Sequence, residues 1–145
     1  MKAVIQRVKR TALSVDGALI SEIPFGLAVY LGVKAGDTEA QAEAIANKVF
    51  KLRIFEDGEG KMNLSVGDVG GEILLISQFT LYGDCSHGNR PSFTEAERPE
   101  KAKPLYEYTA EKLRALGATV KTGVFGADMK IEQFNDGPVT VIYEI

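Results

Sequence analysis

Residues 26–52 read GLAVYLGVKAGDTEAQAEAIANKVFKL and contain the clearest strand and helix patterns of the chain. Its opening part, up to Val33, is nearly all apolar and rich in strand formers, which predicts a strand covered on both faces. The segment Thr38–Gln41 then fits a helical capping box, with Asp37 as an alternative cap. Apolar residues follow at helical spacing, namely Ala42, Ile45, Val49 and Leu52. A buried strand that leads into an amphipathic helix is the building unit of a layered α/β fold.

A second strand–helix unit lies further along the chain. Glu72–Leu81 (EILLISQFTL) is mostly apolar and predicts another buried strand. The polar segment Tyr82–Arg98 follows it, and a loop of this length in a compact domain often carries function. The next helix starts at Pro99 or Pro104, because proline is tolerated in a first turn. It ends at Leu116, with the glycine after it as the C-cap.

Further strands flank the two units. Lys2–Lys9 is expected to be a strand, and Asp16-Gly17 predicts a hairpin between Ala12–Val15 and Ala18–Ile20. Three short strands are expected to close the chain, at Thr119–Thr122, Lys130–Phe134 and Val139–Glu144. The sequence thus predicts an α/β fold of the order β(2)-(βα)2-β(3), with both helices packed on a mixed sheet. The closing strands leave an edge or a face of the sheet open, which a homodimer would cover.

Composition excludes several classes of protein. The 145 residues fit one domain over residues 1–145, and 45% apolar with 26% charged residues is ordinary for a soluble globular chain. One cysteine rules out an intramolecular disulfide, and one histidine leaves little for a metal site. The start, Met1–Val4, lacks the apolar run of a signal peptide. We therefore expect a cytoplasmic protein without a metal, a cofactor or a membrane partner.

Two clusters of reactive side chains are weak candidates for an active site. Cys85 and His87 could form a thiolate–imidazole pair, but catalytic cysteine and histidine usually meet through the fold rather than along one loop. Glu56, Asp57 and Glu59 could do acid–base work, yet such a run is more often a solvated turn, here expected to end the first helix. The phosphate-binding patterns GxxxxGK[ST] and GxGxxG do not occur.

Two other segments are stronger candidates for a functional site. Ser77-Gln78-Phe79-Thr80-Leu81 ends a buried strand, and a strand end can offer backbone N–H groups to a carbonyl oxygen, as a tetrahedral intermediate requires. The plain alternative is a strand that frays into a loop. Asn135–Thr140 (NDGPVT) is expected to join two strands as an ordinary turn, although a Gly-Pro bond can be cis and would then aim successive carbonyls in one direction.

Together these segments resemble the two signature motifs of the D-aminoacyl-tRNA deacylases. Shorter matches keep the same order along the whole chain: Ala3–Val8, Leu52–Phe55, Lys61–Ser65, Arg90–Phe93 and Gly126–Met129. The resemblance implies a homodimeric cytosolic enzyme that hydrolyses the ester between a D-amino acid and its tRNA. It also implies action on glycine mischarged onto alanine tRNA.

The resemblance also implies roles for individual residues at a pocket in the dimer interface. Ser77, Gln78, Phe79 and Thr80 would line the pocket from one subunit, with backbone donors from Phe79 and Thr80. Gly137 and Pro138, joined by a cis bond, would enter from the other subunit and exclude L-amino acids. Phe125 and Met129 would form an apolar wall beside the terminal adenosine, and Arg7 would hold the Gly137–Pro138 segment.

The catalytic route has two interpretations. The hydroxyl of Thr80 could act as a nucleophile, but the sequence offers it no obvious base, because His87 is the only histidine. The 2′-hydroxyl of the terminal ribose is the favoured activator, in which case the protein only positions the ester and supplies N–H donors. Basic side chains that could contact tRNA phosphates are Lys2, Arg7, Lys9, Arg10, Lys48, Lys51, Arg53 and Arg90.

Two functions of other classes remain as alternatives. A small-molecule thioesterase or amidohydrolase could use Cys85 or Thr80 without any tRNA. A non-catalytic RNA-binding module would bind tRNA without deacylating it. The net charge of −3 predicts that any tRNA binding is weak and sensitive to salt.

Overall fold

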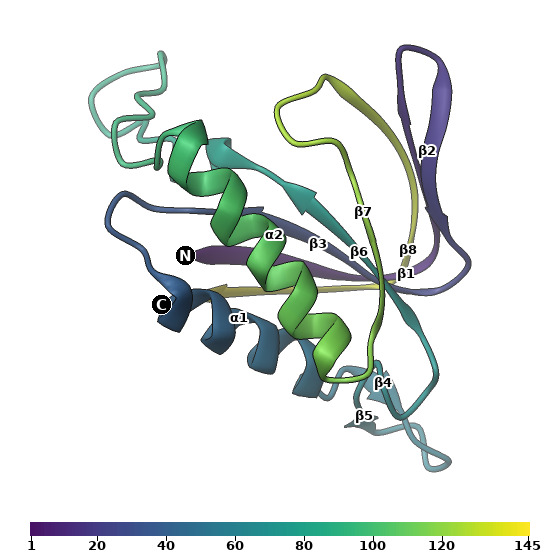
Figure 1. The fold of residues 1–145 in the computed structure, drawn as a ribbon. Helices are drawn as coiled ribbons and strands as arrows, with labels where there is room; N and C mark the ends of the chain where they lie inside the picture. The colour runs from purple at the N-terminus through teal and green to yellow at the C-terminus, as the bar shows by residue number, and fades with distance from the viewer.

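The computed structural model describes residues 1–145, and it confirms the predicted α/β fold with a mixed sheet and two helices (Figure 1). The main sheet has the order β2-β1-β3-β6-β7, and β8 pairs with β1 outside this path. β1 pairs antiparallel with β2, β3 and β8, whereas β3, β6 and β7 run parallel. These strands are β1 (Lys2–Val15), β2 (Ala18–Ile23), β3 (Gly26–Gly32), β6 (Glu72–Ser77), β7 (Thr119–Thr122) and β8 (Met129–Glu144).

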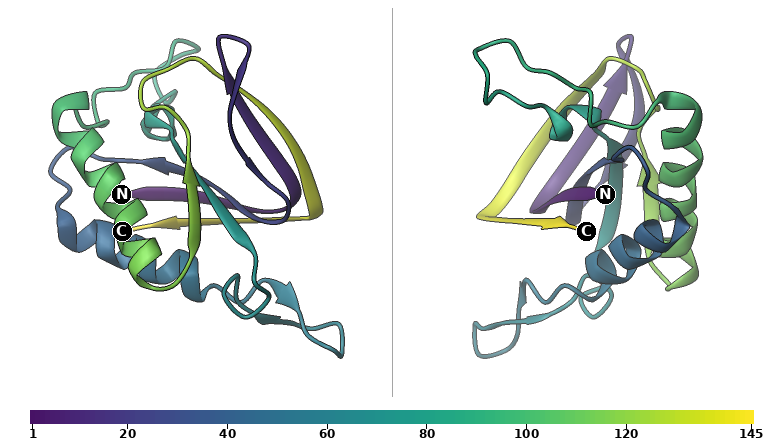
Figure 2. Two further views of the ribbon diagram at one scale, coloured as in Figure 1. Left: turned by 45° about the vertical axis from the view of Figure 1, so that its right-hand side comes forward. Right: turned by 90° about the vertical axis from the view of Figure 1, so that its left-hand side faces the viewer.

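Two helices, α1 (Glu39–Lys51) and α2 (Pro99–Ala115), lie side by side on one face of the sheet (Figure 2). Alternate strand residues such as Leu27, Val29 and Leu75 face them in a core that also holds Ile45 and Leu113 from the helices. Burial of each such side chain stabilises the fold by about 1.5–3 kcal/mol. The opposite face of the same strands is buried too, in a smaller cluster of Val8, Leu13, Ile23, Ala28, Leu74 and Ile76. Neither helix has the length and apolar character that spanning a membrane requires.

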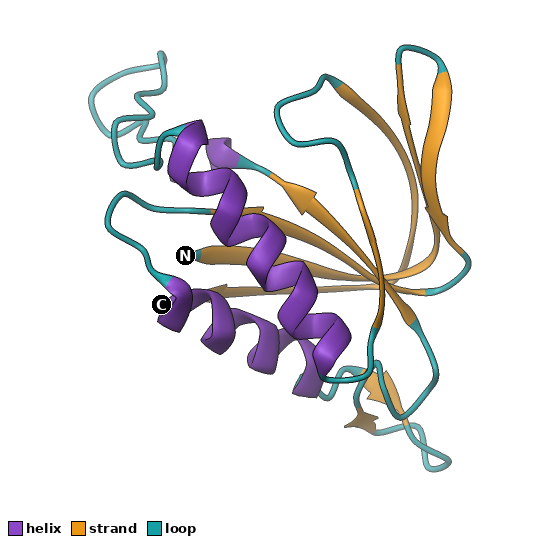
Figure 3. Ribbon diagram, viewed as in Figure 1, coloured by secondary structure: helices purple, strands orange, loops and turns teal.

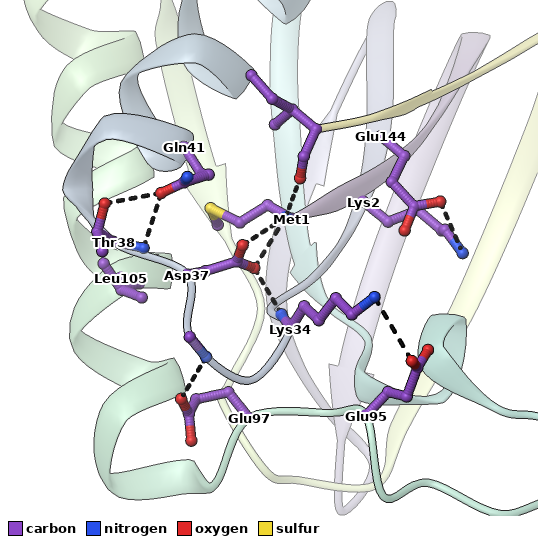
Figure 4. A network of polar contacts seen from close by, with 12 residues as sticks. Met1, Lys2, Lys34, Asp37, Thr38, Gln41, Glu95, Glu97, Leu105 and Glu144 are labelled. Carbon is purple, nitrogen blue, oxygen red and sulfur yellow. Dashed lines mark hydrogen bonds and ion pairs between the residues drawn. The ribbon is translucent and has the colours of Figure 1, made fainter.

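The capping box at the start of α1 is confirmed. The hydroxyl of Thr38 accepts a hydrogen bond from the Ala40 N–H at 3.3 Å, and the Thr38 N–H donates to Gln41 Oε1 at 2.9 Å. Asp37 does not cap the helix. Its carboxylate instead accepts hydrogen bonds from the Met1 ammonium at 2.9 Å and from the Lys34 N–H at 2.6 Å (Figure 4).

The hairpin at Asp16-Gly17 is also confirmed, since both residues have left-handed backbone angles, with φ of 51° and 79°. The prediction of separate strands at Lys2–Lys9 and Ala12–Val15 is wrong, because β1 is continuous. Its ladder with β8 extends from Lys2 to Val15, and register shifts on both sides of Val8 leave only Arg7 and Lys9 without a β8 partner.

The end of the chain is likewise one strand where two were predicted. β8 includes both Lys130–Phe134 and Val139–Glu144, so Asn135–Thr140 is a bulged part of a strand and not a turn between strands. The reason is tertiary: β1 pairs with β8 on both sides of the segment, while residues 136–139 bulge out of the ladder between the pairs Val8–Asn135 and Gln6–Thr140. The Gly137–Pro138 peptide bond is cis.

Some ends of helices and strands differ from the prediction, and Figure 3 shows the observed helices, strands and loops. The strand expected over Glu72–Leu81 ends at Ser77, where its partner β3 ends, and a short 3₁₀ helix η1 (Phe79–Tyr82) follows. α1 ends at Lys51, before a small hairpin of β4 (Phe55–Glu56) and β5 (Met62–Leu64) that the sequence analysis missed. Of the two proposed starts for α2, Pro99 is correct.

Candidate functional site

A largely apolar cavity of about 610 Å³ opens where the sheet meets the start of α2. Its walls come from the ends of β3 and β6, from the loop between η1 and α2, and from the segment between β7 and β8. A cavity of this size and character is typical of sites that bind small molecules or cofactors. The structure brings five of the predicted site residues to its lining, namely Ser77, Gln78, Phe79, Phe125 and Met129.

The motif at the end of β6 presents two free amide groups next to this cavity. The Gln78 N–H still donates to Leu31 O at 2.8 Å, as in the sheet. Phe79 then begins η1, and the N–H groups of Phe79 and Thr80 donate no hydrogen bond within the chain. First-turn amides of a helix lack partners in general, and here they are available to an oxygen that gains negative charge.

Thr80 lies beside the cavity but does not line it. Its side chain is exposed, and its hydroxyl oxygen accepts a hydrogen bond from Gln78 Nε2. No histidine or carboxylate contacts this hydroxyl through a hydrogen bond, so the fold supplies Thr80 with no base.

The apolar wall also includes Tyr106, a lining residue that was not predicted from the sequence. Its ring lies against Phe125 with the centroids 5.9 Å apart, and its hydroxyl donates to Leu75 O at 2.7 Å. Burial raises the pKa of Tyr106 to about 12, so the hydroxyl stays protonated at neutral pH. The helical spacing of Ala102, Tyr106 and Ala110 on the buried face of α2 was the available signal.

Gly137, Pro138 and Arg7 do not line the cavity of their own chain. Arg7 is only 7% exposed, and it donates from Nη1 to Ile54 O at 2.8 Å and from Nε to Asp136 O at 3.3 Å. Its Nε also lies 3.2 Å from Asp136 Oδ2. Because these contacts occupy the guanidinium, Arg7 is not available to an RNA phosphate, contrary to the broader prediction for the basic residues of the first strand.

The weak candidates lie elsewhere. Cys85 and His87 sit in the exposed loop after η1, where no hydrogen bond joins them and neither lines the cavity. The Asp57 carboxylate accepts hydrogen bonds from the Glu59 and Lys61 N–H groups, which lower its pKa and close the β4–β5 turn. No group of three or more His, Cys, Asp or Glu side chains is arranged to hold a metal ion.

Residues 4–144 match the family model described as D-Tyr-tRNA(Tyr) deacylase. The chain belongs to this family. A D-aminoacyl-tRNA deacylase of Thermosipho melanesiensis is 53% identical over 145 residues, covering 99% of this chain and 97% of that protein. A D-aminoacyl-tRNA deacylase of a Geobacillus species is 54% identical over 144 residues, covering 99% and 95%. A solved structure described as c-Myc DNA Unwinding Element Binding Protein superimposes with a TM-score of 0.93 at 43% identity, covering 100% and 99%.

Proposed function

We propose that this protein hydrolyses the ester bond of D-aminoacyl-tRNA, releasing the free D-amino acid and the tRNA. One observation carries the proposal: a member of the D-Tyr-tRNA(Tyr) deacylase family presents the unpaired N–H groups of Phe79 and Thr80 beside an apolar cavity. The names of its relatives support the same reaction. The proposed reaction needs charged tRNA, and we place it in the cytoplasm.

In the proposed reaction the protein positions the ester and stabilises charge. Phe125 and Met129 hold the terminal adenosine against the apolar wall, which brings the ester carbonyl toward Phe79 and Thr80. The ribose 2′-hydroxyl orients a water molecule, whose oxygen bonds to the carbonyl carbon. The bond from that carbon to O3′ then breaks, and the water proton ends on O3′. Each N–H donor to the oxyanion contributes about 10²–10³ in rate in comparable sites.

Chiral selection in this proposal rests on exclusion. An L and a D residue differ only in where the side chain leaves Cα, so a rigid obstacle on one side rejects the L form. Attraction to a substituent is worth only about 1–3 kcal/mol per methylene, whereas a steric clash has no such limit. The backbone carbonyls of Gly137 and Pro138 are the proposed obstacle. Glycine has no side chain to reject, so glycine mischarged onto alanine tRNA is an expected second substrate.

The proposal requires a second copy of the chain, because Gly137 and Pro138 do not reach the cavity of their own subunit. A homodimer would supply them from the partner. The open edge of β8, a strand of 16 residues paired only with β1, supports this arrangement. Arg7 would act as a support, since its bonds to Asp136 fix the backbone immediately before Gly137.

Deacylation of matched D-tyrosyl-tRNA and L-tyrosyl-tRNA, with a chelator present, tests the proposed function. We expect release from the D ester alone. Release from both esters would indicate a general esterase and would contradict exclusion by Gly137 and Pro138. A thioesterase or amidohydrolase would instead hydrolyse small thioesters or amides without tRNA and would lose that activity on Cys85→Ala. Tight tRNA binding without release from any ester would identify a binding module.

The exclusion step has a test of its own in Gly137→Ala. Gly137 has a φ of +123°, and a Cβ added there would lie 3.0 Å from the backbone nitrogen of Val139 and 2.9 Å from its side chain. The substitution therefore displaces the carbonyls of this segment. We expect the ratio of D to L hydrolysis to fall by about tenfold or more, because a shifted obstacle discriminates less. An unchanged ratio in a folded variant would contradict the role of this segment.

A further inference from the structure

Phe79 is an exposed aromatic residue at the mouth of the cavity, and its side chain has one aromatic partner. The ring is 57% exposed, and the ring of Phe93 meets it edge-on, with the centroids 5.2 Å apart and the planes at 71°. Both rings line the cavity. Phe93 comes from the long loop between η1 and α2, so this contact joins the loop to the segment that carries the free amide groups.

Phe93 also touches the far end of the same short helix. A Cβ added at Gly83, the residue after η1, would lie 2.9 Å from Phe93 Cε1 and 3.1 Å from Thr80 O. The Gly83 N–H donates to that Thr80 oxygen at 3.0 Å and closes the turn. One aromatic ring therefore packs against the first residue of η1 and against the residue that ends it.

The loop holds Phe93 in place from both sides. Before it, the N–H of Asp84 donates to Ser92 O at 2.7 Å, and the N–H of Ser92 donates back to Asp84 O at 2.9 Å. After it, the Ala35 N–H donates to Glu95 O at 2.9 Å.

The end of the loop is anchored a second time by Lys34 and Gly36, which lie in the segment after β3. Lys34 Nζ lies 3.5 Å from Glu95 Oε1, and the Gly36 N–H donates to Glu97 Oε2 at 3.3 Å (Figure 4). The ring of Phe93 is thus carried by a segment tied to the sheet, although the loop around it is largely exposed.

We propose that Phe93 is a positioning residue, which fixes the backbone of η1 so that the Phe79 and Thr80 N–H groups point at the reacting carbonyl. The inference rests on the proposed function for its catalytic consequence, but the positioning itself is a property of the free protein. A small displacement of catalytic groups costs up to about a hundredfold in rate. Such a displacement lowers kcat and leaves KM nearly unchanged, because the N–H donors act mainly in the transition state.

Steady-state deacylation of D-tyrosyl-tRNA by Phe93→Ala tests the kinetic part. We expect kcat to fall by about tenfold to a hundredfold while KM changes by less than about threefold. Phe93→Tyr keeps the edge-on ring and should restore kcat. Thr94→Ala, a neighbouring change with an exposed side chain, should match the parent protein. Phe79→Ala combined with Phe93→Ala should be no slower than Phe79→Ala alone, because both remove the same contact.

Amide NMR of the free protein tests the positioning without any substrate. In Phe93→Ala we expect the Phe79 and Thr80 cross-peaks to move and their heteronuclear NOE to fall, with the melting temperature near that of the parent. Unchanged amide signals would overturn the proposal. An increase in KM with an unchanged kcat would also overturn it, because the ring would then contact the substrate directly. If the parent protein released no D-amino acid, the proposed function would fail, while the NMR result would still decide the role of Phe93.

Discussion

Thr80 is the one side chain in the motif that offers a hydroxyl near the proposed reaction centre. Its oxygen accepts a hydrogen bond from Gln78 Nε2, and no basic group contacts it. The backbone N–H of the same residue is free, as is that of Phe79. The backbone N–H groups of Phe79 and Thr80 are therefore free to stabilise an oxyanion, whereas the Thr80 hydroxyl has no base to activate it.

Replacement of Thr80 by valine separates these two roles. Thr80→Val removes the hydroxyl at nearly constant shape and keeps the N–H donor, so we expect kcat to stay within about threefold of the parent value. Single-turnover hydrolysis of D-tyrosyl-tRNA measures the effect. A loss of more than about a hundredfold, restored by Thr80→Ser, would favour the nucleophile interpretation.

The two helices are joined at their exposed surface by a polar cluster of Glu43, Tyr108 and Lys112. Lys112 Nζ lies 2.7 Å from Glu43 Oε1, and the Tyr108 hydroxyl donates to the same oxygen at 2.6 Å. Hydrogen bonds from Lys112 and Tyr108 lower the pKa of Glu43 below its ordinary value of 4.5. These contacts therefore connect α1 to α2 at the surface of the helix pair.

The lowered pKa of Glu43 gives the helix pair a defined pH dependence. Stability from the cluster is fully present above the unfolded pKa and is lost as the pH falls through the lower, folded pKa. The parent protein should therefore melt at a higher temperature than Glu43→Gln at pH 7, and the difference should shrink toward pH 3. Thermal unfolding across this range measures it. Glu111→Gln, an exposed change on α2 outside the cluster, is the control. A melting-temperature difference that stayed constant with pH would contradict the role of Glu43.

In the assembled fold, β8 is a long edge strand of the main sheet. The strand pairs only with β1, and its outer face exposes Phe134 by 59% and Ile142 by 67%. A long edge strand with exposed apolar side chains tends to pair with another chain. The proposed site needs a partner at the same place, because Gly137 and Pro138 lie between these two residues on β8.

A charge at Phe134 tests whether this strand forms the proposed dimer interface. We expect the parent protein to have a solution mass of twice 15.7 kDa and Phe134→Lys to have the mass of one chain. The variant should also lose activity on D-aminoacyl-tRNA, since each site would lack its partner's segment. Light scattering measures the mass. Leu19→Lys changes a residue of β2 that is 61% exposed and is the control; a monomeric parent that was fully active would contradict the arrangement.

The fold class could be predicted because it depends on patterns that repeat over a few residues. The capping box at Thr38, the hairpin at Asp16-Gly17 and the apolar run from Gly26 each formed as expected, since their hydrogen bonds and periodicity are local. Part of the candidate site was equally accessible. The segment from Ser77 to Phe79 stood out as a polar end on a buried strand, and the structure brings it to the cavity.

Local pattern alone did not decide where strands continue or which residues support the site. β1 and β8 are continuous because each is the other's partner, a pairing between residues more than a hundred positions apart. The same holds for the ring contacts of Tyr106 with Phe125 and of Phe93 with Phe79, which form only once helix, loop and sheet have assembled. Short-range patterns were therefore enough to predict both helices, the buried strands and the segment Ser77–Phe79. Strand continuity and the cavity could not be predicted in this way, because both depend on packing between distant segments.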